Sequence, residues 1–480
     1  MSVKANSKKP ARVNGAQRQS TLDPGCAGKV LDRLLLLEQV IPRDDVLQVL
    51  SDSHCLDARR CTLTFEVTCW LVLAMGVLTE LPIRAVFKAA RRLHHGERTP
   101  HRSSLCLARQ RLGIAPLRRL FYRLARPLAR PDTPGAFYGG LRLMAMDATV
   151  LSVPDTKANE KAFGRASGGH RGAAAFPQVR KLSLTEVGTH AEVAFVAKGF
   201  RSTGGRSEQS LVPALLKHVG EGMLLLWDRG FYGFRLWQAA AATGAHLLAR
   251  LACRPHLPVL RQLSDGSYLS KVYRRSYERS LDRDGLSVRV VRYTHNDARR
   301  VDCGKEHRLL TTLLDADAYP ARELIRLYHQ RWEIELVYDE QKTHHDPIRP
   351  GKAAHLRSET PAGVIQELYA LSLGHYLTRA FMVEAAQVEG LDPDRLSFVN
   401  CLRVLKTRLP EYAGLRDEER SSWYRALLAE MAQERTEARR NRINPRVVKV
   451  KMSKFKKKRA QHRGIPPLKQ TFDESIVVLR

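Results

Sequence analysis

Two short apolar stretches that each carry one carboxylate constrain the fold of this chain more than any other feature. The first, residues 143–151, holds Asp147, and the second, residues 223–227, is followed directly by Asp228. Apolar runs of this length are typical of buried strands. An acid is costly in an apolar core, so we expect both acids at strand ends of an α/β sheet, where such sheets place their sites.

The segments around these strands continue a mixed α/β pattern. Residues 179–184 and 192–197 alternate as strands do, with a turn at Gly188 and Thr189 between them. We expect further strands at 246–251 and 309–314, and helices at 207–219, 232–243 and 321–343. Between these elements, residues 255–303 combine short strand patterns with Asp–Gly turns, which indicates a β-rich insertion.

The positive charge of the chain indicates which class of partner it binds. The sequence has 80 Lys and Arg against 49 Asp and Glu, a formal net charge of +31. Thirteen Lys or Arg lie between residues 84 and 130 with one acid, Glu97, so these cations have few internal partners. Nucleic acid fits such a surface, because neutralised phosphates release counterions. A solvated basic face is the alternative.

The sequence does not favour a membrane or an oxidising compartment. The most apolar stretch, residues 67–79, is too short to span a bilayer, and the first 25 residues are polar and basic. The eight cysteines are scattered without a C-x-x-C pair, which fits a reducing cytoplasm. At 480 residues we expect several domains. These are a disordered basic tail (1–25), a helical region (26–135), an α/β domain (136–345, insertion at about 255–305), a helical C-terminal region (346–434) and a basic tail (435–480).

One expected helix carries a polar stripe. Tyr328, Arg331, Glu335 and Lys342 follow one another at intervals of three, four and seven residues. At about 100° per residue they fall within roughly 60° of one helix face. Alone, such a stripe would be a solvated face with ion pairs within the helix.

Three carboxylates, from the two strands and this helix, suit hard cations. Mg²⁺ prefers oxygen ligands, and a pair of ions stabilises the attacking and leaving oxygens of a phosphodiester. Asp147, Asp228 and Glu335 are therefore candidate ligands, and the cations beside Glu335 would hold phosphates. Taken singly, either aspartate could instead be a helix cap or a turn residue.

The residues around the stripe resemble a known family. Residues 328–342 match Y-x2-R-x3-E-x6-K, with R-W-x-I-E intact at 331–335. This pattern is the signature of the insertion-sequence family-four DDE transposases. Asp147-Ala-Thr and Asp228-Arg-Gly-Phe-Tyr resemble that family's two aspartate blocks, and Gly188-Thr189-His190 and residues 107–113 and 444–455 are also similar. The resemblance covers about residues 28–460.

The resemblance implies an RNase H-like catalytic domain with its β insertion between Asp228 and Glu335, and a helical DNA-binding domain at 26–135. It implies Mg-dependent cleavage at the ends of an insertion element and strand transfer into target DNA by cut-and-paste. The enzyme would use two Mg²⁺ ions (Mn²⁺ as a substitute) and act as a homodimer on nucleoid DNA of a prokaryotic cytoplasm. The implied roles are catalysis and metal binding for Asp147, Asp228 and Glu335, and DNA binding for Tyr328, Arg331 and Lys342. From its place beside Asp228, we also expect Arg229 to contact phosphate or to form a structural ion pair.

Two other functions stay open. The chain could be an RNase H-like nuclease that cuts without joining, or an inactive, transposase-derived DNA-binding protein; the intact triad argues against the second. Some family members form a DNA hairpin with an aromatic of the insertion stacked on a flipped base. The insertion here has no Trp but has tyrosines, Tyr268, Tyr273 and Tyr277 among them, and the sequence assigns this role to none of these three.

We expect the N-terminal helical region to bind the element's ends without the catalytic domain. Its affinity should fall steeply as salt rises, because many phosphates are contacted. The measurement is binding of a fragment ending near Pro134 to end and unrelated DNA across a salt series. Equal affinity for both DNAs would place end recognition elsewhere, such as in the basic tail.

Overall fold

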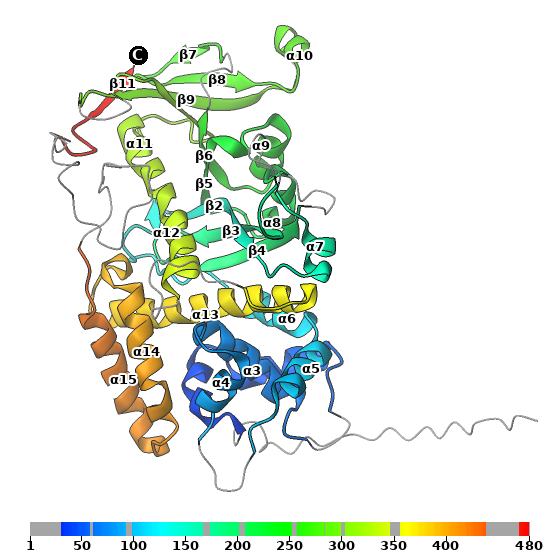
Figure 1. Ribbon diagram of the computed structural model, residues 1–480. Coiled ribbons are helices and arrows are strands. Elements are labelled where there is room, and N and C mark those ends of the chain that lie inside the picture. The colour runs from blue at the N-terminus through cyan, green and yellow to red at the C-terminus, as the bar shows by residue number, and fades with distance from the viewer. Residues whose placement is uncertain are drawn as a thin grey trace, which may run out of the picture.

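The computed structural model describes residues 30–57, 61–92, 98–166, 173–200, 207–251, 257–282, 284–298, 303–345, 356–437 and 470–479. The predicted tail 1–25 and most of the predicted tail 435–480 lie outside these ranges. Figure 1 shows a β-rich end, a central sheet with its helices, and a helical end that α13 separates from the sheet. In the ranges given above, no helix combines the length and apolarity needed to cross a bilayer.

One mixed sheet of eleven strands forms the frame of the molecule. Its order is β4-β3-β2-β5-β6-β10-β9-β8-β7, with β1 paired to β2 and β11 to β9. The predicted mixed α/β fold is confirmed. The bounds are β1 Phe137–Tyr138, β2 Leu141–Ser152, β3 Gln178–Glu186, β4 Glu192–Gly199, β5 Met223–Trp227, β6 His246–Leu251, β7 Arg261–Gln262, β8 Tyr268–Val272, β9 Leu286–His295, β10 His307–Thr311 and β11 Ile476–Leu479.

The five strands at one end of the sheet carry the topology that positions the candidate site. β2, β3 and β4 pair antiparallel, whereas β5 runs parallel to β2 and β6 runs parallel to β5. Three antiparallel strands followed by two parallel ones agree with the RNase H-like fold that the resemblance implies. β5 is apolar throughout because both of its faces are covered.

Helices cover both faces of this part of the sheet. Trp227 of β5 packs in one core with α8 (Pro213–Leu216) and α9 (Phe234–Ala241). Leu224 and Leu226 belong to a second core on the opposite face, with α11 (Ala321–His329) and α12 (Glu333–Asp339). The alternation of neighbouring β5 residues between the two cores is the geometry of a strand at the centre of a sandwich.

The β-rich insertion continues the same sheet. β7, β8 and β9 extend it beyond β10, with the short helix α10 (Ser276–Ser280) between β8 and β9. The last strand, β11, pairs antiparallel with β9 and lies in the range expected to be a basic tail. This strand is not among those expected from the sequence.

The remaining helices share one hydrophobic core, although they come from two distant parts of the sequence. α13 crosses α3 and packs against α14 and α15 (Figure 1). Their bounds are α2 Arg43–Asp52, α3 Phe65–Val77, α4 Ile83–Ala89, α5 Arg102–Leu112, α6 Ala115–Leu124, α7 Lys157–Phe163, α13 Pro361–Val388, α14 Phe398–Tyr412 and α15 Asp417–Gln433. A fragment ending near residue 134 would lack α13, so the full chain is the better material for DNA-binding measurements.

The helix predicted at 321–343 is interrupted twice. α11 ends at His329, the 3-10 turn Gln330–Trp332 follows, and after α12 the chain forms a π turn at Glu340–His344. The wide turn directs Glu340 toward α13, where Arg379 binds its carboxylate. A contact across 39 residues therefore overrides the local helical pattern.

Two glycines let α3 and α13 cross in direct backbone contact. A Cβ at Gly76 would overlap the carbonyl of Ala370, and a Cβ at Gly374 would overlap the carbonyl of Gly76. Both close contacts are with backbone atoms, which cannot move aside as a flexible side chain can. The crossing distance is therefore set by these two residues.

We predict that Gly76→Ala lowers the free energy of unfolding by about 1–3 kcal/mol, because the added methyl forces the two helices apart. Thermal melting of the full chain measures the loss. Gly220→Ala is the matched control, since its Cβ would meet its nearest atom at 4.0 Å. Equal melting temperatures for the two variants would contradict the proposed close crossing.

Candidate active site

Asp147 and Asp228 lie on neighbouring parallel strands. The register pairs Met146 with Trp227, so the next residue on each strand is one of the two aspartates. Asp228 follows the end of β5 and begins the 3-10 turn Arg229–Phe231. The expectation that Asp147 also ends its strand is wrong, because β2 continues to Ser152 while it pairs with β3.

Glu335 belongs to a helix rather than a strand, and it is linked to Asp147 through Arg331. It lies on α12, directly after the 3-10 turn that holds Arg331. Arg331 Nη1 lies 3.3 Å from Asp147 Oδ2, and Nη2 lies 3.3 Å from Glu335 Oε1. One guanidinium therefore lies between the two carboxylates. The Arg331 side chain is 6% exposed, whereas Asp147 is 19% and Glu335 is 40% exposed.

The electrostatics of this group are dominated by burial and by like charges. Burial raises the pKa of Asp147 above its ordinary value and the Asp228 carboxylate adds to the rise, whereas Ala148 and Arg331 oppose it. Burial lowers the pKa of Arg331, but the surrounding acidic groups, Asp228, Asp147 and Glu335 among them, outweigh burial and raise it. A carboxylate pair that is unfavourable when ionised is one that a bound cation stabilises.

Local contacts fix the orientation of Asp147. The backbone N–H of Ala148 donates to Asp147 Oδ1 at 2.7 Å, and the Tyr338 hydroxyl donates to the backbone carbonyl of Asp147. Tyr338 is 7% exposed and lies three residues after Glu335, on the same side of α12. Tyr338 is not among the site residues expected from the sequence, although its spacing from Glu335 is a signal that could have found it.

The other residues predicted to contact DNA differ in how far they are buried. Tyr328 is 7% exposed, and in the part of the chain that the structure describes its buried hydroxyl has no hydrogen-bond partner. Lys342 lies in the π turn, where burial and then Lys181 lower its pKa. Arg229 is exposed directly after Asp228. The structure thus places Arg331 among the three acids, leaves Arg229 accessible and packs Tyr328 into the core.

Two groups of side chains could hold a metal ion. The three carboxylates offer oxygen donors, as Mg²⁺ requires, and Asp147 and Asp228 repel each other when no cation is bound. His190, Glu333 and Asp394 also bring ligand atoms within 4.8 Å of one another. Each group already has a guanidinium beside it, Arg331 in the first and Arg379 in the second. The carboxylate group is the better fit for Mg²⁺ because all three of its donors are oxygens.

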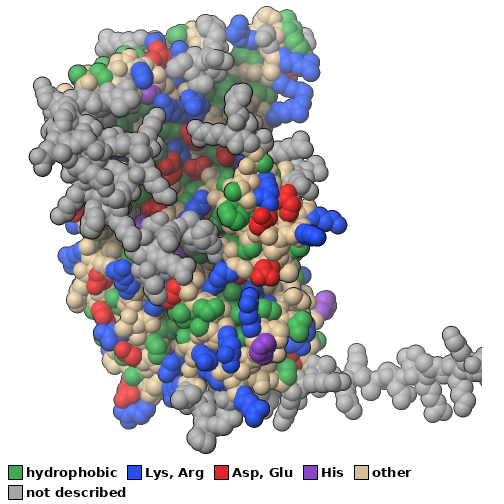
Figure 2. Space-filling view, in the orientation of Figure 1, with side chains coloured by type: hydrophobic (Ala, Val, Ile, Leu, Met, Phe, Trp, Pro, Cys, Tyr) green, Lys and Arg blue, Asp and Glu red, His purple; other side chains and the backbone are tan. Residues whose placement is uncertain are grey.

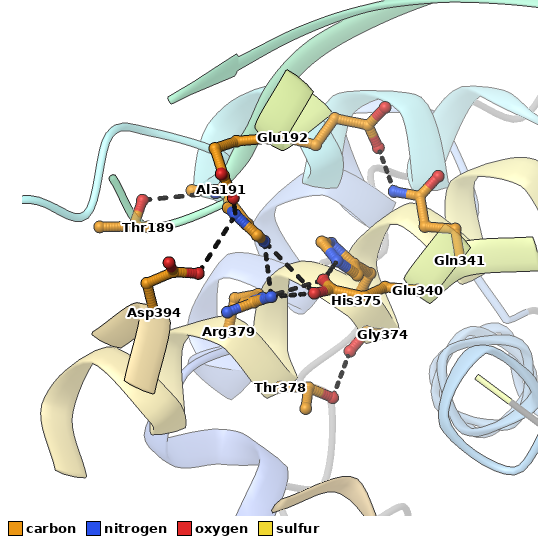
Figure 3. A network of polar contacts seen from close by, with 12 residues as sticks. Thr189, Ala191, Glu192, Glu340, Gln341, Gly374, His375, Thr378, Arg379 and Asp394 are labelled. Carbon is orange, nitrogen blue, oxygen red and sulfur yellow. Dashed lines mark hydrogen bonds and ion pairs between the residues drawn. The ribbon is translucent and has the colours of Figure 1, made fainter. Parts of the chain in front are cut away.

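A buried polar network behind α12 escaped the sequence analysis. It joins Glu340 of the π turn to Arg379 and His375 of α13, and Gln341 to Glu192 of β4 (Figure 3). Lys181 of β3 extends it, with Nζ 2.8 Å from Glu192. The motif Gly188-Thr189-His190, which places a titratable residue in a turn, was the one sequence signal that could have drawn attention to this region.

Figure 2 shows acidic side chains in a hollow below the insertion strands, with Lys, Arg and further acidic side chains over the rest of the visible face. The three candidate ligands are all at least partly exposed. Their negative charges oppose the approach of a phosphate, and a bound cation would make the site favourable for one.

Two families of known proteins match this chain. The family "Insertion element 4 transposase N-terminal" matches residues 31–122, and the family "Transposase DDE domain" matches residues 138–371. Among solved structures, the "Cryo-EM structure of piggyBac transposase synaptic complex with hairpin DNA (SNHP)" has a TM-score of 0.40 and 12% identity, over 85% of this chain and 86% of that chain. A TM-score of that size bears on neither fold nor function.

Two curated relatives come from Escherichia coli (strain K12). "Transposase InsG for insertion sequence element IS4" is 30% identical over 417 residues, which cover 85% of this chain and 90% of the relative. "Putative transposase InsZ" is 25% identical over 197 residues, covering 41% of this chain and 64% of that protein. The match to the first relative across most of both chains, together with the two family matches, shows that this chain belongs to the insertion element 4 family of DDE transposases.

Proposed function

We propose that Asp147, Asp228 and Glu335 form the active site of this transposase. In this proposal the enzyme cleaves DNA at the ends of its insertion element and joins them to target DNA by cut-and-paste. One observation carries the proposal. The buried guanidinium of Arg331 lies between Asp147 and Glu335, while the strand register sets Asp228 beside Asp147. Residues separated by more than 180 positions therefore share one charge environment.

Two Mg²⁺ ions, with Mn²⁺ as a substitute, are the proposed cofactor, and the three carboxylates would hold them. When bound there, they would supply Lewis-acid chemistry for a water or a 3′-hydroxyl and positive charge beside the phosphodiester. The protein supplies a rigid donor set for this chemistry. Asp147 is fixed by Ala148 and Tyr338, and Glu335 is carried on a helix packed against the sheet.

The cations around the acids have distinct proposed roles. Arg229, exposed next to Asp228, is placed to contact a phosphate of the bound strand. Arg331 keeps the carboxylates together and faces the scissile phosphate when DNA is bound. That Lys342 and Tyr328 contact DNA stays a prediction. Because Tyr328 is buried, we favour a role in which it supports Arg331.

The proposed partner is DNA, both the inverted-repeat ends of the element and the target. Two ends must be held at once for transposition, so we propose a homodimer assembled on DNA. The net charge of +31 supports binding to nucleoid DNA, with the bacterial cytoplasm as the proposed setting. A nuclease that cuts without joining is the second candidate, and a strand-transfer assay separates the two.

We predict that Asp147→Asn lowers Mg²⁺-dependent cleavage at the element's ends by about a hundred-fold or more, the effect expected when one preorganised electrostatic group is lost. DNA affinity should be unchanged, because the substitution leaves the basic surfaces intact. Cleavage and strand transfer are measured on a plasmid that carries the element's ends. Asp155→Asn, at an acid that is 51% exposed and paired with Arg165, is the matched control. Normal cleavage by Asp147→Asn would refute the proposed site.

We predict that Arg331→Ala destabilises the metal-free protein by about 1–3 kcal/mol, since the carboxylates lose the cation between them. The partial exposure of Glu335 keeps the loss below that of a fully buried pair. Added Mg²⁺ should reduce the difference in stability between Arg331→Ala and the unsubstituted protein, because a bound ion restores positive charge between the carboxylates. Melting curves with and without Mg²⁺ test this. The control is Arg416→Ala, whose side chain is 71% exposed; a loss no larger than in the control would contradict the role of Arg331.

A further inference from the structure

His190 occupies an unusual position in the turn between β3 and β4. Its φ is +60°, in the left-handed region that residues with a Cβ rarely adopt, and its side chain is almost fully buried. A residue other than glycine is strained in this conformation, and such strain persists where the surroundings fix the conformation. We therefore expect the contacts of the His190 side chain to hold the turn in this conformation.

The imidazole of His190 contacts the helical segment that carries Glu335. Nε2 lies 2.9 Å from Glu333 Oε2, and Nδ1 lies 3.3 Å from Glu340 Oε1. Glu333 precedes Glu335 by two residues, and Glu340 follows it by five. One histidine thus contacts the segment on both sides of the proposed ligand.

Arg379 of α13 contacts both His190 and Glu340. Arg379 Nη2 lies 2.6 Å from His190 Nδ1, and because a guanidinium can only donate, this contact fits the tautomer in which Nδ1 accepts and Nε2–H faces Glu333. In that tautomer Arg379, which also donates to Glu340, bridges Nδ1 and the Glu340 carboxylate. Arg379 also donates to Glu340, with Nε 3.0 Å from Oε2, and His375 lies 2.9 Å from the same oxygen (Figure 3). Glu333, His190, Arg379 and Glu340 are linked in that order.

These contacts lie on the side of α12 that faces away from Asp147. Residues two apart on an α-helix point about 200° apart, so Glu333 and Glu335 project in nearly opposite directions. A hydrogen bond that fixes the rotation of α12 through Glu333 therefore also fixes the direction in which Glu335 points. Asp394 adds a further carboxylate beside His190, with Oδ1 3.9 Å from Nε2.

We propose that His190 is a positioning residue for the reaction, which holds α12 through Glu333 in the rotation that directs Glu335 toward Asp147. Arg379 orients the imidazole, and Glu340 anchors the far end of the segment. The proposal rests on the proposed function, because it takes Glu335 as part of the active site. It assigns His190 and Glu333 no contact with DNA or with the reacting atoms.

The test compares Glu333→Ala with Glu333→Gln in the full-length chain. The alanine variant loses the acceptor for His190, whereas the glutamine amide oxygen can still accept from Nε2. The cleavage rate at saturating DNA is measured across a Mg²⁺ series, together with DNA affinity and thermal melting. Asp339→Ala is the matched control, since Asp339 lies on the same helix but pairs with His344 near the surface.

We expect Glu333→Ala to raise the Mg²⁺ concentration for half-maximal cleavage, or to lower the maximal rate, by about 10–100-fold, the range for losing a group that orients a metal ligand. DNA affinity should not change, and Glu333→Gln should recover most of the activity. A structural role alone would lower stability without shifting the Mg²⁺ dependence. Glu333→Ala behaving like Asp339→Ala, or failure of the glutamine to rescue, would overturn the proposal.

His190→Gly provides a second, independent variant. Glycine adopts a positive φ without strain, so the turn is kept while the imidazole is removed. We expect the same shift in Mg²⁺ dependence as for Glu333→Ala, and the double variant should be no worse than either single one, because both remove one contact. Additive losses would overturn the link. Glu335→Gln separates the two proposals: if it cleaves normally the proposed function fails, and if it is inactive while Glu333→Ala is normal only the positioning role fails.

Discussion

Ionised side chains inside a protein need partners, and this constraint joins the parts of the molecule around the candidate site. Arg331 satisfies the acids on one side of α12. Arg379 satisfies Glu340 on the other side and holds the pKa of that carboxyl well below its ordinary value, although burial acts in the opposite direction. Because the partners come from β2, the β3–β4 turn and α13, the position of α12 depends on all three at once.

Much of the sheet could be predicted from local pattern. β5 occupies residues 223–227 and β6 occupies residues 246–251, as expected. The two interruptions of the helix expected at 321–343 could not be predicted, because they coincide with tertiary contacts, of Arg331 with Asp147 and of Glu340 with Arg379, rather than with any helix-breaking residue. The pairing of β11 with β9 depends on residues nearly two hundred positions apart, which no local periodicity reports.

The candidate site, too, could be predicted from the sequence only in part. Asp147 and Asp228 were visible because an acid inside an apolar run is conspicuous, and Glu335 was visible through the spacing of its neighbours. The burial of Tyr328 and the partial burial of Lys342 follow from the packing of α11 on the sheet and from the π turn. His190 carried too little local signal, since its importance lies in the backbone angle of its turn and in contacts with Glu333 and Glu340.

The crossing of α3 and α13 has a consequence for synthesis of the chain. α3 is buried from Val67 to Val77, and 264 residues separate the end of α6 at Leu124 from the end of α13 at Val388. At ribosomal rates that stretch takes on the order of tens of seconds to make. During that time the N-terminal helices lack the partner that covers them. The N-terminal helices are thus made early and complete their core late, and strands β2 to β6 have the opportunity to pair before that core is complete.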